Sequence, residues 1–329
     1  MQALTYDIIA AAAQEPLLTE RRFDDLKRHY AAHSSQEKKF PNKTELLKAY
    51  HELTESGKIK KDEHLERILT RRAVRSLSGV AIITSLIKPY PCPGKCVYCP
   101  LDERMPKSYL SEEPAAMRAL TLEFDPYEQM AKRIEALENN GHPTDKIEFI
   151  IKGGTWNSYP LSYQYWFILR SFQACNEIRG KKIENTYHEA SPLPELRAEL
   201  LRQQTINETA DHRIIGLTLE TRPDCINDHT IWIMRELGAT RLEIGLQHTD
   251  DDVLTLIKRG HTSQEAKDAL ELLRNYGFKT DLHLMPQLPG SSPQRDLAMI
   301  KKTFDDPGFK PDMIKIYPCS VVKNSELYD

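Results

Sequence analysis

The sequence lacks any long hydrophobic run. In a chain of 329 residues the longest largely apolar stretch, GVAIITSLI, covers only residues 79–87, well short of the ~18 residues that a membrane-spanning helix needs. The N-terminus also lacks the basic start and the cleavage pattern of a secretory signal peptide. These absences exclude an integral membrane protein, and we expect a cytoplasmic globular protein with no membrane association.

A strong excess of one charge is also missing. The net charge is −3, with 28% charged residues, which excludes a uniformly basic nucleic-acid-binding protein but allows a local basic patch. Two basic clusters occur near the N-terminus: Lys58, Lys60 and Lys61, then Arg67, Arg71, Arg72 and Arg75. Each cluster is compatible with a solvated helix face. Their position just before an unusual loop favours a surface that contacts phosphates.

Cysteines are few, yet three of the six lie within eight residues. Cys92, Cys96 and Cys99 form a C-x3-C-x2-C pattern, whereas Cys175, Cys225 and Cys319 are isolated and are expected to be small buried or half-buried side chains. In a reducing compartment, clustered cysteines more often bind metal than form disulfides. A structural zinc site needs four ligands, and no second C-x2-C motif is present. Three thiolates instead suit a [4Fe-4S] cluster with one iron left open.

The rest of the chain alternates apolar runs with amphipathic stretches. Strands are expected at residues 80–86, 147–151, 214–219, 241–247, 280–285 and 313–317, and helices between them at 126–139, 161–176, 228–237, 263–276 and 293–303. This alternation predicts an α/β fold, a partial (β/α)6 barrel over residues 79–329. Residues 1–78 form a small helical region, with helices expected at 4–14, 20–33, 43–56 and 62–69.

Unusual residues follow every expected strand. The cysteine loop follows the first, and the others are followed or ended by KGGTW (152–156), ETRPD (220–224), QH (247–248), MPQLPG (285–290) and YPCS (317–320). In parallel sheets, functional groups collect at the carboxyl ends of the strands. Ordinary turns explain each segment alone, but six at one rim predict a binding site.

A cysteine loop of this spacing, after the first strand of a β/α barrel, is the signature of radical S-adenosylmethionine (SAM) enzymes. The open iron of such a cluster binds the amino and carboxylate groups of SAM. Tyr98 is expected to pack near the adenine, and Gly153 and Gly154 to allow close backbone approach to the SAM ammonium, unless they only form a tight turn. Glu220 and Arg222 suit the sugar hydroxyls and the carboxylate, although an ordinary salt bridge is the alternative.

Several longer segments resemble the Elp3 family, which comprises the catalytic subunit of Elongator and its single-chain bacterial and archaeal relatives. They include RRAVRSLSGVAIITSLIKPYPCPGKCVYCP, LTLETRPD, TRLEIGLQH, RGHTSQEA and HLMPQLPGSS, in family order from about Arg71 to Tyr328. The resemblance implies a radical-SAM enzyme that modifies wobble uridine 34 of tRNA. In the implied reaction, the deoxyadenosyl radical activates the acetyl group of acetyl-CoA. The activated acetyl group adds to C5 of the uridine, and hydrolysis leaves a carboxymethyl group.

The resemblance also assigns residues. It makes Cys92, Cys96 and Cys99 the cluster ligands. It places Gly153, Gly154, Thr155, Glu220, Arg222 and Gln247 on the SAM side, with Lys152, Glu220 and Arg222 as candidate catalytic residues. Arg104, Lys107 and the Arg67–Arg75 cluster become candidates for contacts with tRNA phosphates or CoA, and Lys58, Lys60 and Lys61 for contacts with tRNA. The implied partners are tRNA, acetyl-CoA and, in a eukaryote, other Elongator-type subunits.

The family normally continues into an acetyltransferase-like domain that binds acetyl-CoA, and this sequence stops before it. We therefore expect a truncated form that ends before the last barrel helix and does not complete the reaction alone. Two alternatives stay open. One is a radical-SAM methylthiotransferase, disfavoured because no cysteine precedes Cys92. The other is a tRNA-binding or Elongator-type assembly module whose cluster is structural or absent, in which stoichiometric zinc would replace iron.

Overall fold

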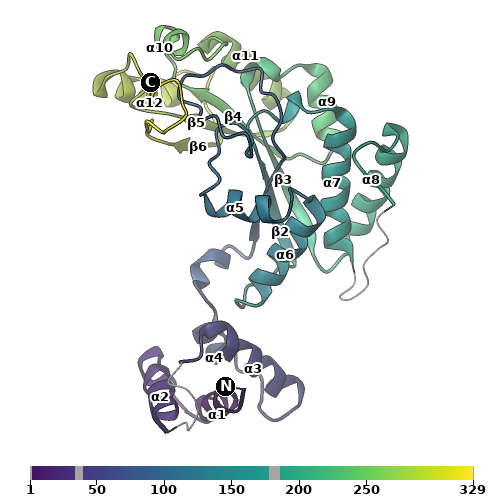
Figure 1. The fold of residues 1–329 in the computed structure, drawn as a ribbon, viewed down its shortest axis with the longest axis vertical. Helices are drawn as coiled ribbons and strands as arrows, with labels where there is room; N and C mark the ends of the chain where they lie inside the picture. Colours follow the sequence, from purple (N-terminus) through teal and green to yellow (C-terminus); the bar gives the residue numbers. More distant parts are fainter. Residues whose placement is uncertain (1, 34–39, 178–185, 329) are drawn as a thin grey trace. The chain divides into compact units, whose positions relative to one another are not determined.

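The computed structural model describes residues 2–33, 40–177 and 186–328. The chain divides into two compact units (Figure 1). The first comprises Met1–Ala81 with Lys132–Lys146, and the second comprises Ile82–Ala131 with Ile147–Asp329. Within the described residues, no helix is both long enough and apolar enough to cross a membrane.

The first unit is helical, as predicted. Its elements are α1 (Gln2–Ala12), α2 (Glu20–His33), α3 (Lys43–Glu55), α4 (Glu63–Leu69) and the 3-10 turn η1 (Ala73–Ser76). Asn42 caps α3 by accepting a hydrogen bond from the Glu45 N–H, while the Glu45 carboxylate accepts the Asn42 N–H at 2.8 Å. This reciprocal capping satisfies amide groups that a helix start leaves free. The buried faces of the helices form one apolar core around Phe23, Leu46 and Tyr50.

The second unit is built on a six-stranded sheet. Its strands are β1 (Ala81–Leu86), β2 (Lys146–Lys152), β3 (Arg213–Thr221), β4 (Arg241–Gln247), β5 (Lys279–Leu284) and β6 (Met313–Ile316), and they lie in the order of the sequence. The pairs from β3 to β6 are parallel. The predicted partial (β/α)6 barrel is therefore confirmed, and the expected strands differ from the observed ones mainly at their ends.

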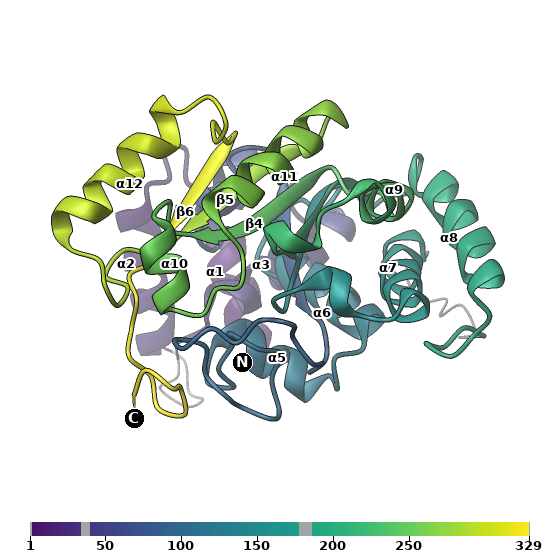
Figure 2. The ribbon, with the colours of Figure 1, turned by 90° about the horizontal axis from the view of Figure 1, so that it is seen from above.

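Helices connect successive strands. They are α5 (Pro114–Thr121), α6 (Pro126–Glu138), α7 (Leu161–Asn176), α8 (Leu193–Asn207), α9 (Asp228–Glu236), α10 (Asp251–Leu256), α11 (Ser263–Asn275) and α12 (Pro293–Asp305), with 3-10 turns η2 (Trp156–Ser158) and η3 (Pro223–Cys225). Figure 2 shows α7, α9, α11 and α12 on the outer side of the sheet. The sequence did not predict α5, α8 or α10.

The central strands bury an apolar face, and charged side chains occupy the alternate positions. Leu219, Leu242, Ile244, Leu282 and Leu284 are fully buried and share the face on which α7 contacts β3 and α11 contacts β5. Because the strands run parallel in sequence order, their carboxyl ends meet at one rim. The sequence segments that follow the strands are thereby brought together.

Candidate functional site

The cysteine loop follows β1 without forming a helix. All three thiols are free, with Cys96 and Cys99 buried and Cys92 half-buried. The loop packs against α10 and the segment before α12 through Val253, Leu254 and Leu288. A small apolar core therefore holds the thiols at the rim of the sheet.

The last described residues also hold this loop. The Leu327 N–H donates to the Val97 carbonyl at 2.9 Å, and the Leu101 N–H donates to the Asn324 carbonyl at 2.8 Å. These bonds join the loop after the first strand to the segment after the sixth. The sequence did not predict this contact, because nothing local marks residues 319–328 as partners of the cysteine loop.

The three cysteine sulfurs do not all lie close enough together to form one compact group of metal ligands. Among the described residues, the ligand atoms that come within 4.8 Å of one another belong to Glu243, Asp281 and His283, and the three cysteine sulfurs form no such group. Tetrahedral zinc would bring its sulfurs to about 3.8 Å, given bonds of about 2.3 Å. The three sulfurs therefore do not form a ready tetrahedral zinc site, whereas three thiolates are the protein ligands that a [4Fe-4S] cluster with one open iron needs.

Each cysteine sulfur has a polar partner of its own, and Cys96 and Cys99 also share a hydrogen bond with each other. Cys92 Sγ lies 3.5 Å from the Thr155 hydroxyl, and Cys99 Sγ lies 3.1 Å from the Ser108 hydroxyl. Cys96 Sγ accepts a 3.3 Å hydrogen bond from the guanidinium of Arg259. The hydrogen bond from Cys99 and the charge of Arg259 lower the pKa of the Cys96 thiol to about 4. Cys96 is therefore ready to act as a thiolate ligand.

The diglycine turn after β2 meets the end of β3. Glu220 Oε2 accepts a 2.9 Å hydrogen bond from the Tyr109 hydroxyl and lies 3.3 and 3.4 Å from the amide nitrogens of Gly153 and Gly154. The predicted role of the glycines was close approach of their carbonyls to SAM. That role stays a prediction. The structure directs the amide groups of both glycines to Glu220, so the turn also orients a carboxylate at the rim.

The backbone conformation at both positions requires glycine. Gly153 and Gly154 have φ angles of 141° and 91°, which side chains other than glycine rarely adopt. A Cβ atom on Gly153 would come within 2.2 Å of Ile87 Cγ1. The pair is therefore more than a flexible link between β2 and η2.

Arg222 is buried and fully engaged. Its Nε and Nη2 atoms both donate to Asp224 at 2.9 Å, and Nη2 also donates to the Arg259 carbonyl at 2.7 Å. Its Nη1 atom lies 4.0 Å from Cys96 Sγ and near Gly94, where a Cβ atom would come within 2.4 Å of it. Arg222 thus links the cysteine loop to the segment after α10.

Two buried side-chain oxygen atoms near the cysteine loop and the end of β4 have no hydrogen-bond partner among the described residues. They are the Tyr98 hydroxyl and Gln247 Oε1, and Gln247 also has a φ of 75°. Buried polar groups are nearly always hydrogen-bonded, so these atoms match a polar ligand. With three free thiols and an oriented carboxylate, the residues fit both an iron–sulfur cluster and SAM.

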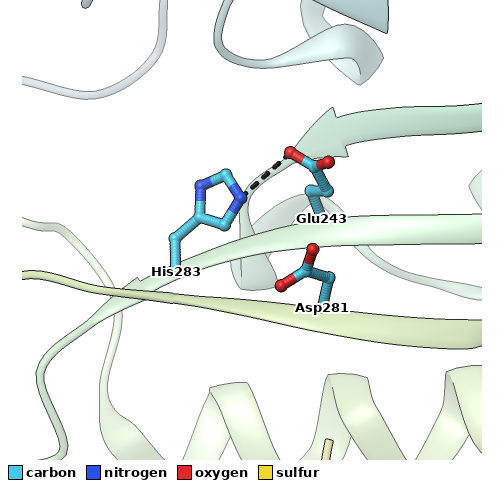
Figure 3. A group of neighbouring side chains, drawn as sticks. All are labelled: Glu243, Asp281 and His283. Atoms are coloured by element: carbon cyan, nitrogen blue, oxygen red, sulfur yellow. Dashed lines mark hydrogen bonds and ion pairs between the residues drawn. The ribbon is translucent and has the colours of Figure 1, made fainter. Parts of the chain in front are cut away.

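A network of charged side chains lies below the rim. Lys152 and Lys315 both form ion pairs with the fully buried Glu243, His283 Nε2 lies 3.0 Å from Glu243 Oε2, and Lys315 lies 3.4 Å from Asp281. Figure 3 shows Glu243, Asp281 and His283 converging from neighbouring strands. These three could ligate a metal ion, but the two ammonium groups already balance the two carboxylates.

This network sets the protonation of Lys152. Burial lowers the pKa of Lys152, but the nearby carboxylates of Glu220 and Glu243 outweigh that effect and raise it. The hydrogen bond from His283 and the charge of Lys152 lower the pKa of Glu243 despite its burial. Sequence reasoning singled out Lys152 alone; the polar residues at alternate positions in β4 and β5 were the signal for the rest.

The predicted basic residues fall into two groups. Lys58, Lys60, Lys61, Arg67, Arg71, Arg72 and Arg75 are exposed on the helical unit. In the sheet unit, the exposed Arg104 binds Asp102, whereas Lys107 is half-buried and donates to the Gly94 carbonyl at 3.1 Å. Lys107 therefore supports the cysteine loop.

Comparison with known proteins agrees with this geometry. The model of the radical SAM superfamily matches residues 88–301. The chain is 44% identical over 295 residues to a tRNA uridine(34) acetyltransferase of Methanocaldococcus infernus, covering 88% of this chain and 51% of that protein. It is 36% identical over 279 residues to Elongator complex protein 3 of Schizosaccharomyces pombe, covering 81% and 48% respectively.

A solved structure of the M. infernus Elp3, lacking its residues 1–46, superposes with a TM-score of 0.59 at 40% identity. The superposition covers 76% of this chain and 48% of that one. The chain spans about half the length of the curated relatives it matches. With the family match covering the cysteine loop and most of the sheet, this chain belongs to the radical SAM superfamily.

Proposed function

We propose that this protein is a radical-SAM enzyme that modifies uridine 34 of tRNA. The observation that carries the proposal is the group of three free cysteines in the loop after β1, beside a carboxylate held by the diglycine turn. The similarity to tRNA uridine(34) acetyltransferases supports the choice of substrate. In the proposed reaction, the bound cluster and SAM supply a deoxyadenosyl radical that activates the acetyl group of acetyl-CoA for addition to C5 of the uridine.

Each side chain at the rim has its own role in binding the cluster or SAM. Cys92, Cys96 and Cys99 hold the cluster. Glu220, fixed by Tyr109 and the glycine amides, accepts hydrogen bonds from the ribose hydroxyls of SAM. The unpartnered oxygen atoms of Gln247 and Tyr98 contact the ribose or substrate and the adenosine end of the ligand. Thr155 supports Cys92.

Lys152 and Arg222 act as fixed cations. Because the surrounding carboxylates raise the pKa of Lys152, it keeps its proton and serves as a hydrogen-bond donor rather than as a base. The Arg222 guanidinium donates hydrogen bonds to the Asp224 carboxylate and the Arg259 carbonyl. Arg222 therefore positions the loop around Cys96. The exposed basic residues of the helical unit supply contacts to tRNA phosphates.

The test is anaerobic cluster reconstitution of the whole chain, followed by incubation with SAM, reductant, tRNA and acetyl-CoA. We expect broad visible absorption and formation of deoxyadenosine, and carboxymethylated uridine if the chain alone binds acetyl-CoA. Cys96→Ala should abolish both cluster and deoxyadenosine. Cys175→Ala is the matched control, since Cys175 is buried in α7. A Cys96→Ala variant that retained both signals would refute the proposal.

One observation favours a second function. The exposed basic residues from Lys58 to Arg75 suit a tRNA-binding or assembly module with a structural cluster or none. That function predicts salt-dependent tRNA binding without deoxyadenosine. Stoichiometric zinc in place of iron, with tRNA binding intact, would favour it.

A further inference from the structure

Arg259 is a buried arginine close to a cluster ligand. It follows α10, its side chain is 6% exposed, and its Nη1 atom donates to Cys96 Sγ at 3.3 Å. Its Nε atom donates to the Gly245 carbonyl and to His261 Nε2, each at 3.1 Å, and its Nη2 atom donates to the same carbonyl. The guanidinium is therefore aimed at the sulfur by the end of β4.

The backbone of Arg259 is fixed as well. Its carbonyl accepts a 2.7 Å hydrogen bond from Arg222 Nη2, and Arg222 is held by two bonds to Asp224. The neighbouring Gly260 has a φ of 82°, and a Cβ atom there would come within 3.2 Å of Arg222 Nη2. Two arginines and a glycine turn thus hold the donor in one position.

The positive charge of Arg259 has no carboxylate partner in the part of the chain that the structure describes. A buried charge without a counter-ion is costly. The thiolates at the cysteine loop are the available anions, and a cluster bound to them becomes more negative by one charge when it is reduced.

The other two cysteines have uncharged partners. Cys92 lies beside the Thr155 hydroxyl and the Gly94 amide, and Cys99 lies beside the Ser108 hydroxyl. Hydrogen bonds to cluster sulfurs are among the factors that set reduction potentials, and bonds from charged donors are the strongest. Cys96 is thus the ligand through which the protein acts most strongly on the cluster.

We infer that Arg259 is the counter-ion of the cluster and raises its reduction potential by stabilising the reduced form through Cys96. This inference rests on the cluster of the proposed function, but it concerns the potential and not the substrate. Removing the charge should make the reduced form less stable. Keeping the charge while changing its geometry should have a smaller effect.

The experiment is a redox titration monitored by electron paramagnetic resonance on the reconstituted full chain, without SAM or tRNA. At a fixed potential we expect Arg259→Gln to lower the ratio of reduced to oxidised cluster about tenfold, equivalent to ~59 mV, and Arg259→Lys to lower it less. Arg235→Gln is the control, because Arg235 donates only to backbone carbonyls, of Ala239 and Tyr276.

Two results would overturn the inference. One is an Arg259→Gln protein with full iron content and the wild-type potential. The other is loss of iron from both Arg259 variants with unchanged circular dichroism, which would make Arg259 a purely structural residue. A wild-type protein that holds the cluster but does not cleave SAM would refute the proposed function instead, and the potentials would still decide the role of Arg259.

Discussion

The Tyr109 hydroxyl donates a 2.9 Å hydrogen bond to the Glu220 carboxylate, joining the segment after the cysteine loop to the end of β3. A hydrogen bond to a charged group contributes about 1.5 kcal/mol or more. We therefore expect Tyr109→Phe to weaken SAM binding about tenfold, measured by calorimetry on the reconstituted protein. Tyr276→Phe is the control, since Tyr276 makes a 2.9 Å bond to Asp228 on the surface. Equal affinities in both variants would contradict this role.

The diglycine turn should resist substitution for two reasons at once. Gly153→Ala combines a strained φ of 141° with a clash, because the added Cβ would lie 2.2 Å from Ile87 Cγ1. Gly277→Ala introduces only the strain, because Gly277 has a φ of 74° and no atom lies within 4 Å of an added Cβ. Strain costs about 1–2 kcal/mol, and overpacking adds about 1–3 kcal/mol. Urea unfolding should therefore show the larger loss for Gly153→Ala. A similar decrease in the free energy of unfolding for the two variants would mean that the diglycine turn and Ile87 can shift to accommodate the added methyl group.

Substitutions in the charged network around Glu243 should lower the stability of the protein by different amounts. Glu243→Gln leaves the ammonium groups of Lys152 and Lys315 without their shared partner, so we expect a loss of about 3 kcal/mol in the free energy of unfolding. Lys152→Met should cost less, because Lys315 and His283 still compensate Glu243. Denaturant titration of both variants measures the difference. The reverse order would show that Lys152 is the main counter-ion.

His261 should make stability depend on pH. Burial and the charge of Arg259 lower its pKa from 6.5 to about 4. Above pH 6.5 both folded and unfolded states are neutral and this stability is complete. As the pH falls from 6.5 towards 4, His261 takes up a proton only in the unfolded state. The free energy of unfolding should therefore decrease by about 2 kcal/mol between pH 7 and pH 5.

Urea titrations at pH 7 and pH 5 check this expectation. His261→Gln should show a smaller decline than the wild type between the two pH values. His229→Gln, which changes an exposed histidine on α9, should decline as the wild type does. An unchanged decline in His261→Gln would assign the effect to other groups.

The sequence predicted the parts of the fold that depend on local pattern. The apolar runs identified all six strands, and the rule that sites collect at strand ends placed Gly153 and Glu220 at one rim. Helix α10 was missed because six residues carry too little periodicity. Helix α8 was missed because its small buried face is interrupted by polar residues such as Gln203 and Asn207.

The contacts that set the chemistry of the site depend on distant residues. Glu243 meets Asp281 because the two are register partners in β4 and β5, and His283 pairs with Lys315 in the same way between β5 and β6. Neither register is written in one segment of sequence. Arg259 and Cys96 lie 163 positions apart, and no local motif links them.

The bonds between the cysteine loop and residues 324–327 also affect the order of folding. The Val97 carbonyl accepts its hydrogen bond from Leu327, which lies 230 positions later in the chain. Contacts between residues so far apart in sequence form slowly during folding. During synthesis the loop therefore emerges long before its final partner. The bonds that tie the cysteine loop to residues 324–327 can therefore form only after β6 has been synthesised.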